Sequence, residues 1–579
     1  MAAWGAGALL VIVACFPLAL SSAPEECARR GSAATAEEDG SQVGVSMLQH
    51  TGSLSMSPSP GPAPAGTDAA RAKPNIVLFL PDDMYLEEYY PSGEEEPIAP
   101  GFSSSLQFAS RPIPNSGMMP KLDAIVRTGA TFSMAYSTSS TCTPSRYSIL
   151  TGRYPSRSQF GKGFTQATLS SAQRAFVGEG VTFFGEDDQS ENIVQTLRSV
   201  GYTTGMVGKW GLNAQADGAD FDIPYPNLTG LVQMSGFDFV DGLYIQNQNV
   251  CTDDICNDFS HNMEWQTWSA LRFMDGAIKQ DMPFFLYFAA TLPHRTPDAS
   301  DALLGLFNSS QTPAGLLPEP PDIFRYCSSC TLASHEAIWN ASIVSPTQHV
   351  RPQLAALRWL DESLGIIYDF LSERGAIDNT YLVISTDHGS LKGSLFELGV
   401  RVPLHVVGPG IAANARVTEL VSHVDMAPTF MEWAGCGSGT ADCSSIGLEE
   451  LDGLSWASLV SGKVAHLDRH EIYFEAMLDR AIVNKDHVKF ISRQTDDIDS
   501  FLNASDEDAR SDLCERLIDL SSLSTAYPAY NASEQLYDLI GDSSEEVNLV
   551  PESGSSSGLQ SYRDLIMAHD DLTYTSEVT

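Results

Sequence analysis

Four apolar runs that end abruptly in polar residues constrain the fold of this chain more than any other feature. The runs occupy residues 75–80, 203–207, 283–290 and 381–385. Near-continuous apolar runs of this kind are typical of strands that are buried on both faces of a sheet. Helical periodicity separates them, for example at residues 190–200 and 351–374. We therefore predict an α/β protein whose large, mixed and mostly parallel sheet is flanked by helices.

The pattern changes after about residue 465. Shorter apolar segments at residues 471–476 and 481–492 predict β-strands, and residues 484–486 predict a hairpin turn within the second segment. These segments predict a small C-terminal α+β domain that is built on an antiparallel sheet. We assign residues 73–464 to the main domain, 465–555 to the smaller domain and 556–579 to a tail.

The first 72 residues lack the pattern of a packed domain. Residues 5–20 form an apolar run followed by small residues, which predicts a signal peptide at 1–23. The run is shorter than the roughly 20 residues that span a membrane comfortably, so an uncleaved signal anchor is the competing interpretation. Residues 24–72 are rich in Ser, Gly, Ala and Pro, a composition typical of a flexible linker or pro-segment.

Sequons and cysteines indicate a chain that enters the secretory pathway and is then secreted or kept in a lysosome or another lumen. Asn-x-Ser/Thr sequons, the acceptors of N-glycans, occur at Asn227, Asn308, Asn340, Asn503 and Asn531. Of ten cysteines, Cys15 leaves with the leader, and all the others except Cys142 can pair. Close spacing predicts disulfides 251–256, 327–330 and 436–443, with 27–514 as a long-range possibility. The pair 327/330 is alternatively half of a metal site, but no second such pair exists in the sequence.

The chain is strongly acidic. Its formal net charge is −40 and its isoelectric point is about 4.4. Long-range repulsion opposes binding to nucleic acid or to an anionic membrane, so we exclude nucleic acid as a partner. We expect membrane association only if the leader stays uncleaved. An anionic substrate would need concentrated local positive charge, so the positions of the scarce lysines are informative.

Polar side chains follow the apolar runs at the same end of each run. Asp82 and Asp83 follow the first run, and Asp387 and His388 follow the last. In open parallel sheets ligands bind beyond the carboxyl ends of the strands, so these clusters should converge. Carboxylates packed together require a cation. Their oxygen atoms favour Ca²⁺ or Mg²⁺, while His388 leaves Mn²⁺ or Zn²⁺ open.

Cys142 opens the string Cys-Thr-Pro-Ser-Arg-Tyr-Ser-Ile-Leu-Thr-Gly-Arg at residues 142–153. Pro144 suits the first position of a helix and Gly152 suits its end, so we expect a short helix with Cys142 at its N-terminus. Unpaired amides and the helix dipole favour negative charge there. Arg146 adds a planar, permanently charged fork for an oxyanion. The string thus indicates a nucleophile that handles anions, with a buried structural cysteine as the alternative.

This string resembles the signature of the type I sulfatases of the alkaline phosphatase superfamily, in which Cys-x-Pro-Ser-Arg precedes Leu-Thr-Gly-Arg. The resemblance implies that a formylglycine-generating enzyme of the secretory pathway converts Cys142 to formylglycine, whose hydrated aldehyde is the nucleophile. It also implies a metal ion, usually calcium, with Mg²⁺ or Mn²⁺ as alternatives. The ligands implied by the family motif are Asp82, Asp83, Cys142, Asp387 and His388.

Three further residues match positions of the sulfatase family that contact the sulfate or the leaving group. They are Lys209 in Gly-Lys-Trp, His294 in Leu-Pro-His, and Lys392 shortly before Phe-Glu-Leu-Gly-Val-Arg-Val-Pro. The resemblance implies that the two lysines and Arg146 hold the sulfate oxygens. It also implies that His294, together with Lys392, protonates the departing oxygen.

The resemblance spans about residues 73–549 and has one clear departure. The family commonly carries a histidine where this chain has Gly211, and Asn213 is a nearby candidate to replace it. Near the carboxyl end, residues 535–539 with Glu545 and Asn548 are similar to a segment of many sulfatases. His405 and His423 match no family position, so we expect structural roles for both.

These observations predict a hydrolase that cleaves a sulfate monoester to an alcohol and inorganic sulfate. An aryl or carbohydrate sulfate is expected as substrate, either a small molecule or a polysaccharide, with a modest preference for a polysaccharide because we expect the chain to be exported. A phosphonate monoester or phosphodiester hydrolase of the same superfamily is the nearest alternative. A catalytically silent binding protein with the same fold is a second alternative, which Gly211 motivates.

Overall fold

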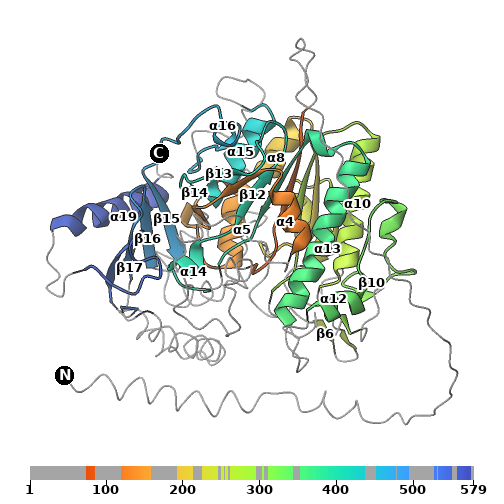
Figure 1. Ribbon diagram of the computed structural model, residues 1–579, viewed down its shortest axis with the longest axis horizontal. Coiled ribbons are helices and arrows are strands. Elements are labelled where there is room, and N and C mark those ends of the chain that lie inside the picture. Colours follow the sequence, from red (N-terminus) through yellow and green to blue (C-terminus); the bar gives the residue numbers. More distant parts are fainter. Residues whose placement is uncertain are drawn as a thin grey trace, which may run out of the picture.

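A large sheet forms the centre of the protein, with helices on both of its faces (Figure 1). The computed structural model describes residues 73–84, 119–157, 192–212, 225–244, 250–252, 255–257, 261–294, 303–304, 311–342, 352–389, 391–436, 451–476, 479–493, 527, 529–530, 532–550 and 557–575. The segments assigned to a signal peptide and a linker lie outside these residues, as do Cys27, Cys443, Cys514 and Asn213.

The central sheet has eight strands, and most neighbouring pairs are parallel. In spatial order the strands are β13 (Ala415–Val417), β2 (Ala130–Phe132), β12 (Leu404–Val407), β11 (Thr380–Ser385), β1 (Asn75–Phe79), β8 (Phe284–Ala289), β4 (Thr203–Lys209) and β5 (Phe239–Tyr244). Strand β1 pairs in parallel with β11 and β8, and β4 pairs in parallel with β8 and β5. Only β12 runs antiparallel to its two neighbours. The predicted α/β class with a mixed, mostly parallel sheet is confirmed.

The apolar character of β1 follows from its place in the sheet. All five of its residues are buried, and they alternate between two cores on opposite faces of the sheet. Ile76 and Leu78 belong to one core, whereas Val77 and Phe79 belong to the other. Successive side chains of a strand point to opposite faces, so a run that is apolar at every position suits a sheet covered on both sides.

Helices form a layer on each face (Figure 1). One layer contains α4 (Pro120–Val126), α10 (Met263–Lys279), α12 (His335–Ala341) and α13 (Pro352–Glu373). The other contains α5 (Cys142–Thr151), α8 (Ile193–Ser199), α9 (Tyr225–Met234), α15 (Met426–Trp433) and α16 (Ala457–Val460). The helices predicted at 190–200 and 351–374 correspond to α8 and α13.

Short elements occupy the loops between these layers. Among the described residues, the 3-10 helices are η2 (Pro155–Arg157), η4 (Ile323–Arg325), η5 (Ile377–Asn379) and η6 (His423–Asp425). The short strand pairs are β3 (Ala135–Tyr136) with β14 (Val421–Ser422), β6 (Val250–Thr252) with β7 (Ile255–Asn257), and β9 (Gln311–Thr312) with β10 (Gly315–Leu316). One more helix, α14 (Glu397–Val400), follows the loop that contains Lys392.

A second sheet forms the C-terminal part of the protein, and it is antiparallel as predicted. Its strands, in spatial order, are β15 (Glu471–Ala476), β16 (Asp479–Asn484), β17 (Val488–Ser492) and β18 (Glu534–Asp538). The turn predicted at 484–486 separates β16 from β17. One face of this sheet shares a core with the main domain, in which Phe474 and Ile491 are clustered with Tyr136 and Val400.

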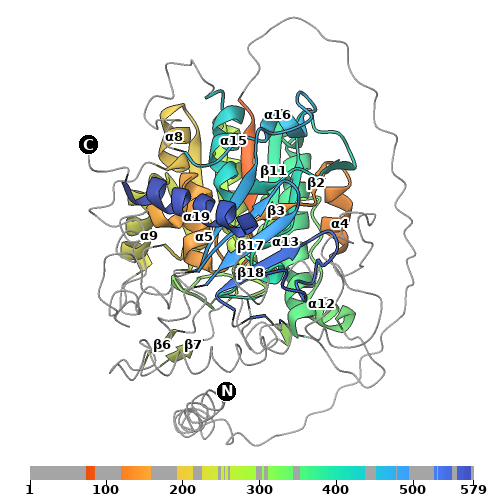
Figure 2. The same ribbon diagram turned by 90° about the vertical axis from the view of Figure 1, so that its left-hand side faces the viewer.

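Helix α19 (Ser557–Thr575) covers the other face of the C-terminal sheet (Figure 2). Leu559 and Ile566 of the helix are buried together with Ile482 and Phe490 of the sheet. From the sequence we assign these residues to a tail, whereas the structure shows a docked helix. The difference has a physical reason, because packing of an amphipathic face supplies most of the stability of helices in proteins.

Some of the predicted disulfide cysteines and sequons fall within the described residues. Cys327 and Cys330 form the predicted disulfide, so their alternative role in a metal site is wrong. Cys436 is also disulfide-bonded, to a partner whose side chain lies outside the described part of the chain. Cys251 and Cys256 stand opposite each other in the backbone register of β6 and β7. Asn227 and Asn340 are exposed, and the other three sequons lie outside the described residues.

None of the helices in the described segments combines the length and the apolar character that crossing a membrane requires.

Candidate active site

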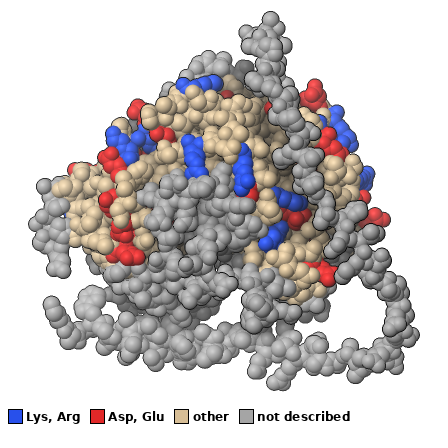
Figure 3. Space-filling view, in the orientation of Figure 1, with Lys and Arg blue, Asp and Glu red and all other residues tan. Residues whose placement is uncertain are grey.

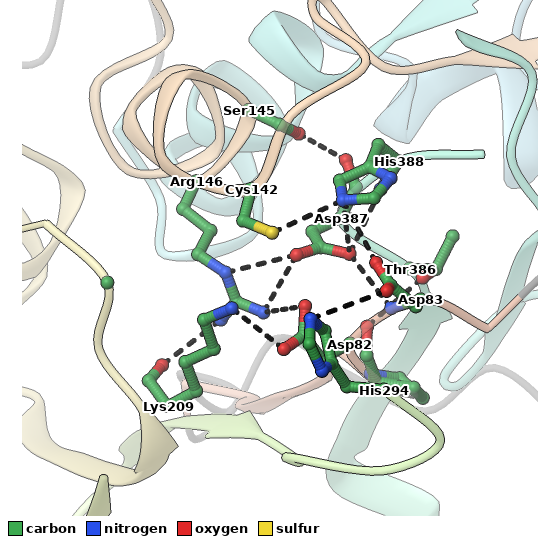
Figure 4. A network of polar contacts seen from close by, with 12 residues as sticks. Asp82, Asp83, Cys142, Ser145, Arg146, Lys209, His294, Thr386, Asp387 and His388 are labelled. Atoms are coloured by element: carbon green, nitrogen blue, oxygen red, sulfur yellow. Dashed lines mark hydrogen bonds and ion pairs between the residues drawn. The ribbon is translucent and has the colours of Figure 1, made fainter. Parts of the chain in front are cut away.

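The loops that follow four strands meet at the carboxyl edge of the central sheet (Figure 4). The residues that they contribute are Asp82 and Asp83 after β1, Lys209 at the end of β4, His294 after β8, and Asp387 and His388 after β11. Cys142 and Arg146 reach the same place from the first turns of α5. Lys392 joins them from the loop before α14, because its Nζ lies 3.1 Å from Asp83 Oδ2. All nine side chains that the sequence predicts for the site are therefore brought together.

Hydrogen bonds from backbone amides after β1 to side chains after β11 fasten these two segments to each other. Asp83 adopts a left-handed conformation with φ of 61°, which aspartate tolerates better than most residues. Its backbone N–H donates to Asp387 Oδ1 over 3.2 Å. The next N–H, from Met84, donates to Thr386 Oγ1 over 3.1 Å. These bonds fix the adjacent carboxylates of Asp82 and Asp83 against the second acidic segment.

Helix α5 presents Cys142 at its N-terminus, as predicted. Thr141 occupies the N-cap position, Cys142 is the first helical residue, and Gly152 ends the helix with φ of 69°. Pro144 is thus the third residue of the helix rather than the first. Proline, which has no N–H, is tolerated at this position too, because the amides of the first turn have no partner within the helix. The Sγ atom of Cys142 lies 3.2 Å from His388 Nε2.

Arg146 is fully buried between two of the carboxylates. Its Nη2 lies 2.9 Å from Asp387 Oδ2 and 3.3 Å from Asp82 Oδ1, and its Nη1 donates to the Lys209 carbonyl over 3.1 Å. Burial opposes the charge of the guanidinium, but Tyr287 and the two carboxylates raise its pKa well above its ordinary value. The guanidinium therefore stays charged and organises the acidic residues around it.

The charge state of Asp82 follows from its neighbours. Lys209 Nζ lies 2.8 Å from Asp82 Oδ2, and both side chains are buried. Burial alone would raise the pKa of Asp82, but Lys209, His294 and Arg146 hold it well below its usual range. Conversely, burial lowers the pKa of Lys209, and Asp82 more than reverses that effect. The pair is therefore ionised inside the protein.

His388 faces the acidic residues with a defined nitrogen. Its Nδ1 lies 2.7 Å from the carbonyl oxygen of Gly389, which can only accept a hydrogen bond, so Nδ1 carries a proton. Its Nε2 points to Asp83 Oδ1 at 3.0 Å. Burial opposes a charge on this imidazole, but Asp387, Cys142 and Asp83 raise its pKa well above its ordinary value.

The arrangement suits a metal ion. Asp82, Asp83, Cys142 and His388 each offer one ligand atom, and these atoms all lie within 4.8 Å of one another. The bond from Nδ1 to Gly389 orients the imidazole with Nε2 toward the other donors, as a ligating histidine requires. Carboxylate oxygens favour a hard cation. The residues present therefore fit the ion that the sequence predicts.

Asp387 lies beside this group of donors rather than within it. Arg146 holds its Oδ2, and the N–H groups of Asp83 and His388 donate to its Oδ1. Burial and the neighbouring Asp82 raise the pKa of Asp387. Its carboxylate therefore links Arg146 to the acidic segment.

Lys392 and His294 line the side of the site that opens to solvent. The Lys392 side chain is 37% exposed and that of His294 is 24% exposed, whereas Lys209 is only 3% exposed. Lys392 Nζ lies 3.3 Å from His294 Nε2. Burial lowers the pKa of His294 to about 4, although Asp82 and Asp83 oppose the shift. Of these three side chains, Lys392 and His294 are therefore the more accessible to solvent.

Several residues that sequence reasoning missed support the site. Ser145 Oγ donates to the carbonyl oxygen of Asp387 and lies 2.8 Å from His423 Nδ1. Thr143 Oγ1 donates to the Gly211 carbonyl over 2.7 Å. Both hydroxyls belong to the Cys142 string, so their position in the string could have suggested them.

His261 is a further buried histidine near the site, and no pattern in the sequence predicts it. It lies just before α10, at the same edge of the sheet. Burial lowers its pKa to about 3, and the charges of His294 and Lys209 contribute to that shift. Only the tertiary structure brings this ring near them.

Gly211 stands at the position where the resemblance to the sulfatase family leads us to expect a histidine. Its φ is 70°, and the atoms nearest to an added Cβ would be Arg146 Cδ and Lys209 Cε, each 3.6 Å away. That separation is ordinary van der Waals contact, so the backbone conformation rather than crowding opposes a side chain here.

Comparisons with known proteins agree with this geometry. The sulfatase family model matches residues 74–436. The chain is 26% identical over 408 residues to the extracellular sulfatase SULF-1 homolog of Drosophila melanogaster, covering 63% of this chain and 30% of that protein. It is 23% identical over 391 residues to an N-acetylglucosamine-6-O-sulfatase of Bacteroides thetaiotaomicron, covering 55% of this chain and 63% of that protein. The chain thus spans less than two thirds of either relative.

A solved structure shows the same fold. It comes from work on the metabolism of multiple glycosaminoglycans by Bacteroides thetaiotaomicron, and it superposes with a TM-score of 0.54 at 18% sequence identity. The superposition covers 86% of this chain and 99% of the solved one. Since the family model also matches more than half of its length, this chain belongs to the sulfatase family.

Proposed function

We propose that the protein hydrolyses a sulfate monoester to an alcohol and inorganic sulfate. One observation carries the proposal: carboxylates, cations and the N-terminus of α5 surround a single point at the carboxyl edge of the sheet (Figure 4). The names of the curated relatives support the sulfate ester over a phosphonate or phosphodiester.

The nucleophile in this proposal is the residue at position 142 after its conversion to formylglycine. The Sγ atom of Cys142 then stands in for the oxygens of the hydrated aldehyde. One hydroxyl gives its proton to a neighbouring carboxylate and forms a bond to sulfur, the bond between sulfur and the ester oxygen breaks, and the alcohol leaves with a proton from the pair of His294 and Lys392. The second hydroxyl loses its proton, which expels sulfate and restores the aldehyde. A thiol has no second hydroxyl for that last step.

Positive charge around residue 142 stabilises the transferred group. Lys209 and Lys392 contact carboxylates on either side of the acidic pair, at Asp82 and at Asp83. We propose that both ammonium groups bind sulfate oxygens. Arg146 keeps its contacts with Asp82 and Asp387 and adds fixed positive charge behind the nucleophile. Cations held in place before the reaction accelerate it where negative charge develops.

We propose that His294 and Lys392 protonate the departing oxygen. Their side chains lie 3.3 Å apart on the exposed side of the site, where the alcohol portion of a substrate would project. Because the pKa of His294 is about 4, its imidazole is mostly neutral near neutral pH, so the neighbouring ammonium group of Lys392 carries the proton that the pair delivers.

A hard divalent cation completes the proposed site. Asp82, Asp83, His388 and the residue at 142 would hold it, with Ca²⁺ preferred and Mg²⁺ or Mn²⁺ as alternatives. Such an ion would supply positive charge to the sulfate and the nucleophile. We retain Asp387 as a candidate ligand because of its motif, although Arg146 occupies one of its oxygens.

We propose a sulfated carbohydrate as the substrate class and export through the secretory pathway. The name of the N-acetylglucosamine-6-O-sulfatase relative supports the carbohydrate, and that of the extracellular relative supports the export. The disulfide at Cys327 and the exposed sequon residues Asn227 and Asn340 are consistent with a secreted glycoprotein.

The test uses full-length protein from a eukaryotic secretory host. Mass spectrometry of the tryptic peptide 128–146 measures conversion of Cys142, and rates are measured on an aryl sulfate and the matching aryl phosphate and methylphosphonate. We expect the mass of formylglycine, hydrolysis of the sulfate, and none by Cys142→Ala. Faster hydrolysis of the phosphorus esters would favour the rival hydrolase. An intact thiol with no turnover would favour a silent binding protein.

A further inference from the structure

A buried ionic cluster joins the C-terminal sheet to the loop that carries Lys392. Its centre is Lys489 on β17, whose side chain is fully buried. Lys489 Nζ lies 3.1 Å from Glu397 Oε1 and 3.0 Å from Glu545 Oε1. Glu397 is the first residue of α14 in the main domain, which lies beside the C-terminal sheet (Figure 1). We call Lys489, Glu397, Glu545, Arg401 and Tyr136 the Lys489 cluster.

Glu397 is held from several directions within the cluster. Its backbone N–H donates to Glu545 Oε2 over 2.6 Å. Its Oε2 accepts from the Tyr136 hydroxyl at 3.1 Å and lies 3.4 Å from Arg401 Nη1. Two carboxylates thus face two cations, and the N-terminus of α14 has a fixed position.

The position of α14 determines that of the Lys392 loop. The N–H of Gly389 donates to the carbonyl of Gly399 over 3.0 Å, and that of Leu391 donates to Leu398 over 3.1 Å. The backbones approach so closely that a Cβ on Gly389 would lie 2.2 Å from the Leu398 carbonyl oxygen. The two ends of the loop are therefore locked together directly after Glu397. A shift of α14 must move the backbone beside Lys392 and His388.

The charge of Lys489 needs an explanation beyond stability. Replacing a buried ion pair with apolar residues is often neutral or stabilising, and Lys489 also borders apolar side chains. Its Nζ lies 5.5 Å from the centre of the Phe474 ring, and Phe474 belongs to the core shared by the two domains. An apolar side chain would fill this space but would not hold the carboxylate of Glu397.

We propose that Lys489 is a positioning residue that acts through Glu397 and α14 to hold Lys392 in its catalytic place. The C-terminal sheet then takes part in turnover without touching the substrate. This inference rests on the proposed contact of Lys392 with the sulfate. A displacement of a contacting group by about 1 Å can reduce a rate about 100-fold, so a small movement of the loop is sufficient.

A double-mutant cycle with full-length protein tests the inference. Lys489→Met keeps most of the side-chain volume and removes the charge. We expect it to lower kcat/KM on an aryl sulfate by at least about tenfold in the presence of Lys392. In a Lys392→Ala background the same substitution should change kcat/KM less than about twofold, because the group that it positions is gone. Equal losses in both backgrounds, or no loss in either, would overturn the proposal.

A second readout separates positioning from catalysis. Hydrogen exchange of residues 386–401 should accelerate in Lys489→Met, because the amides of Gly389 and Leu391 lose their fixed partners. If Lys489→Met accelerates exchange but Lys392→Ala loses no activity, the positioning of the loop is supported and the proposed role of Lys392 is wrong. Unchanged exchange would contradict positioning itself.

The control is Arg563→Met, which removes an ion pair with Glu534 between α19 and β18. We expect it to leave both kcat/KM and the exchange of the loop unchanged. Glu545→Gln is the alternative variant if Lys489→Met does not fold, and it should show the same dependence on Lys392. If neither variant folds, the cluster is a folding element and the proposal is wrong.

Discussion

In the site, buried basic side chains contact buried carboxylates of opposite charge. Arg146 and Lys209 neutralise Asp82 and Asp387 in a region from which water is excluded. Removing one member of such a group leaves its partner charged and buried, which typically costs about 3–5 kcal/mol. Variants of these residues lose stability together with catalysis, so an activity assay alone does not separate the two effects. Residues at the margin of the group give cleaner tests.

Gly208 in β4 and Gly211 just after this strand both have a positive φ, so a comparison of the two isolates the effect of crowding. Gly211→Ala should lower the free energy of unfolding by about 1 kcal/mol, because φ is 70° while the nearest atoms are 3.6 Å from the new Cβ. Gly208→Ala should cost about 3 kcal/mol or more, because its Cβ would lie 2.0 Å from the Ala289 carbonyl oxygen. Urea denaturation measures both values. Equal losses would show that crowding does not distinguish the two positions.

Substitution of His294 should affect substrates according to their leaving groups. His294→Gln is expected to lower kcat/KM for a carbohydrate sulfate by about 10²–10⁴-fold, because an alkoxide needs a proton to leave. For 4-nitrophenyl sulfate, whose phenolate leaves without one, we expect a much smaller loss. His405→Gln is the matched control, since His405 is buried on β12 and contacts Thr131 at 3.0 Å. A loss that is the same for both substrates would argue against proton donation.

At the scale of elements, one buried glutamate connects helix α19 with the rest of the protein. Glu475 of β15 lies 2.9 Å from His569 Nε2 on α19. It also accepts a hydrogen bond from the Ser156 hydroxyl over 2.6 Å. Tyr154 and His569 pack edge to face with ring centres 4.6 Å apart. The helix is therefore attached to the end of the segment that begins with Cys142.

The pKa of Glu475 predicts how stability depends on pH. Burial would raise it, but His569, Arg480 and Ser156 lower it from 4.5 to about 2. Between these values the unfolded chain binds a proton that the folded protein does not. The stabilisation of the folded protein by ionised Glu475 is therefore complete above pH 4.5 and is lost as pH falls toward 2. Its size is about 3 kcal/mol.

Glu475→Gln should remove this contribution. We expect unfolding of the variant to be easier at neutral pH and less dependent on pH in the acidic range, as measured by urea denaturation at a series of pH values. Glu534→Gln serves as the control because Glu534 makes a partly exposed pair with Arg563. A wild-type protein whose stability is constant down to pH 2 would contradict the interpretation.

At the scale of the whole molecule, the net charge of −40 opposes the approach of an anionic substrate. On the face shown in Figure 3, the described basic and acidic side chains are interspersed. Two of the three cations of the site lie inside the protein, where Arg146 is fully buried and Lys209 is 3% exposed, and the third, Lys392, is 37% exposed. The positive charge of the site therefore attracts a sulfate group only at short range. A long polyanion is also repelled by the acidic surface of the protein.

Salt should consequently affect large and small substrates differently. Raising ionic strength from about 10 mM to about 150 mM shortens the screening length from about 30 Å to about 8 Å. We expect kcat/KM to increase for a sulfated polysaccharide and to change little for a singly charged aryl sulfate. Initial rates measured across this range test the effect. A decrease for the polysaccharide would indicate a basic surface that guides it.

Removal of metal should lower the stability of the whole domain, because the donor residues come from three different segments of the chain. Returning Ca²⁺ at about 100 times its dissociation constant should stabilise the protein by about 2.7 kcal/mol. Calorimetry with and without a chelator measures the difference. Asp83→Asn should lose most of this response, and a wild-type protein with no response would contradict the metal site.

The sequence by itself determined four strands of the central sheet, the α/β class and which polar side chains gather at one edge of the sheet. It could do so because continuous apolar runs are local signals, and because polar residues after parallel strands must share an edge. The sequence predicts Pro144 as the first residue of the helix, whereas it is the third residue of α5. Helix boundaries depend on capping contacts that a sequence pattern does not contain.

Only the tertiary structure decided the contacts that cross the chain. Lys489 and Glu397 are 92 residues apart, and no periodicity marks them as partners. Helix α19 forms by docking on the C-terminal sheet, and His261 reaches the site through the start of α10. Pairings of this kind depend on packing between distant segments. A local pattern records which residues are buried but not which residues they meet.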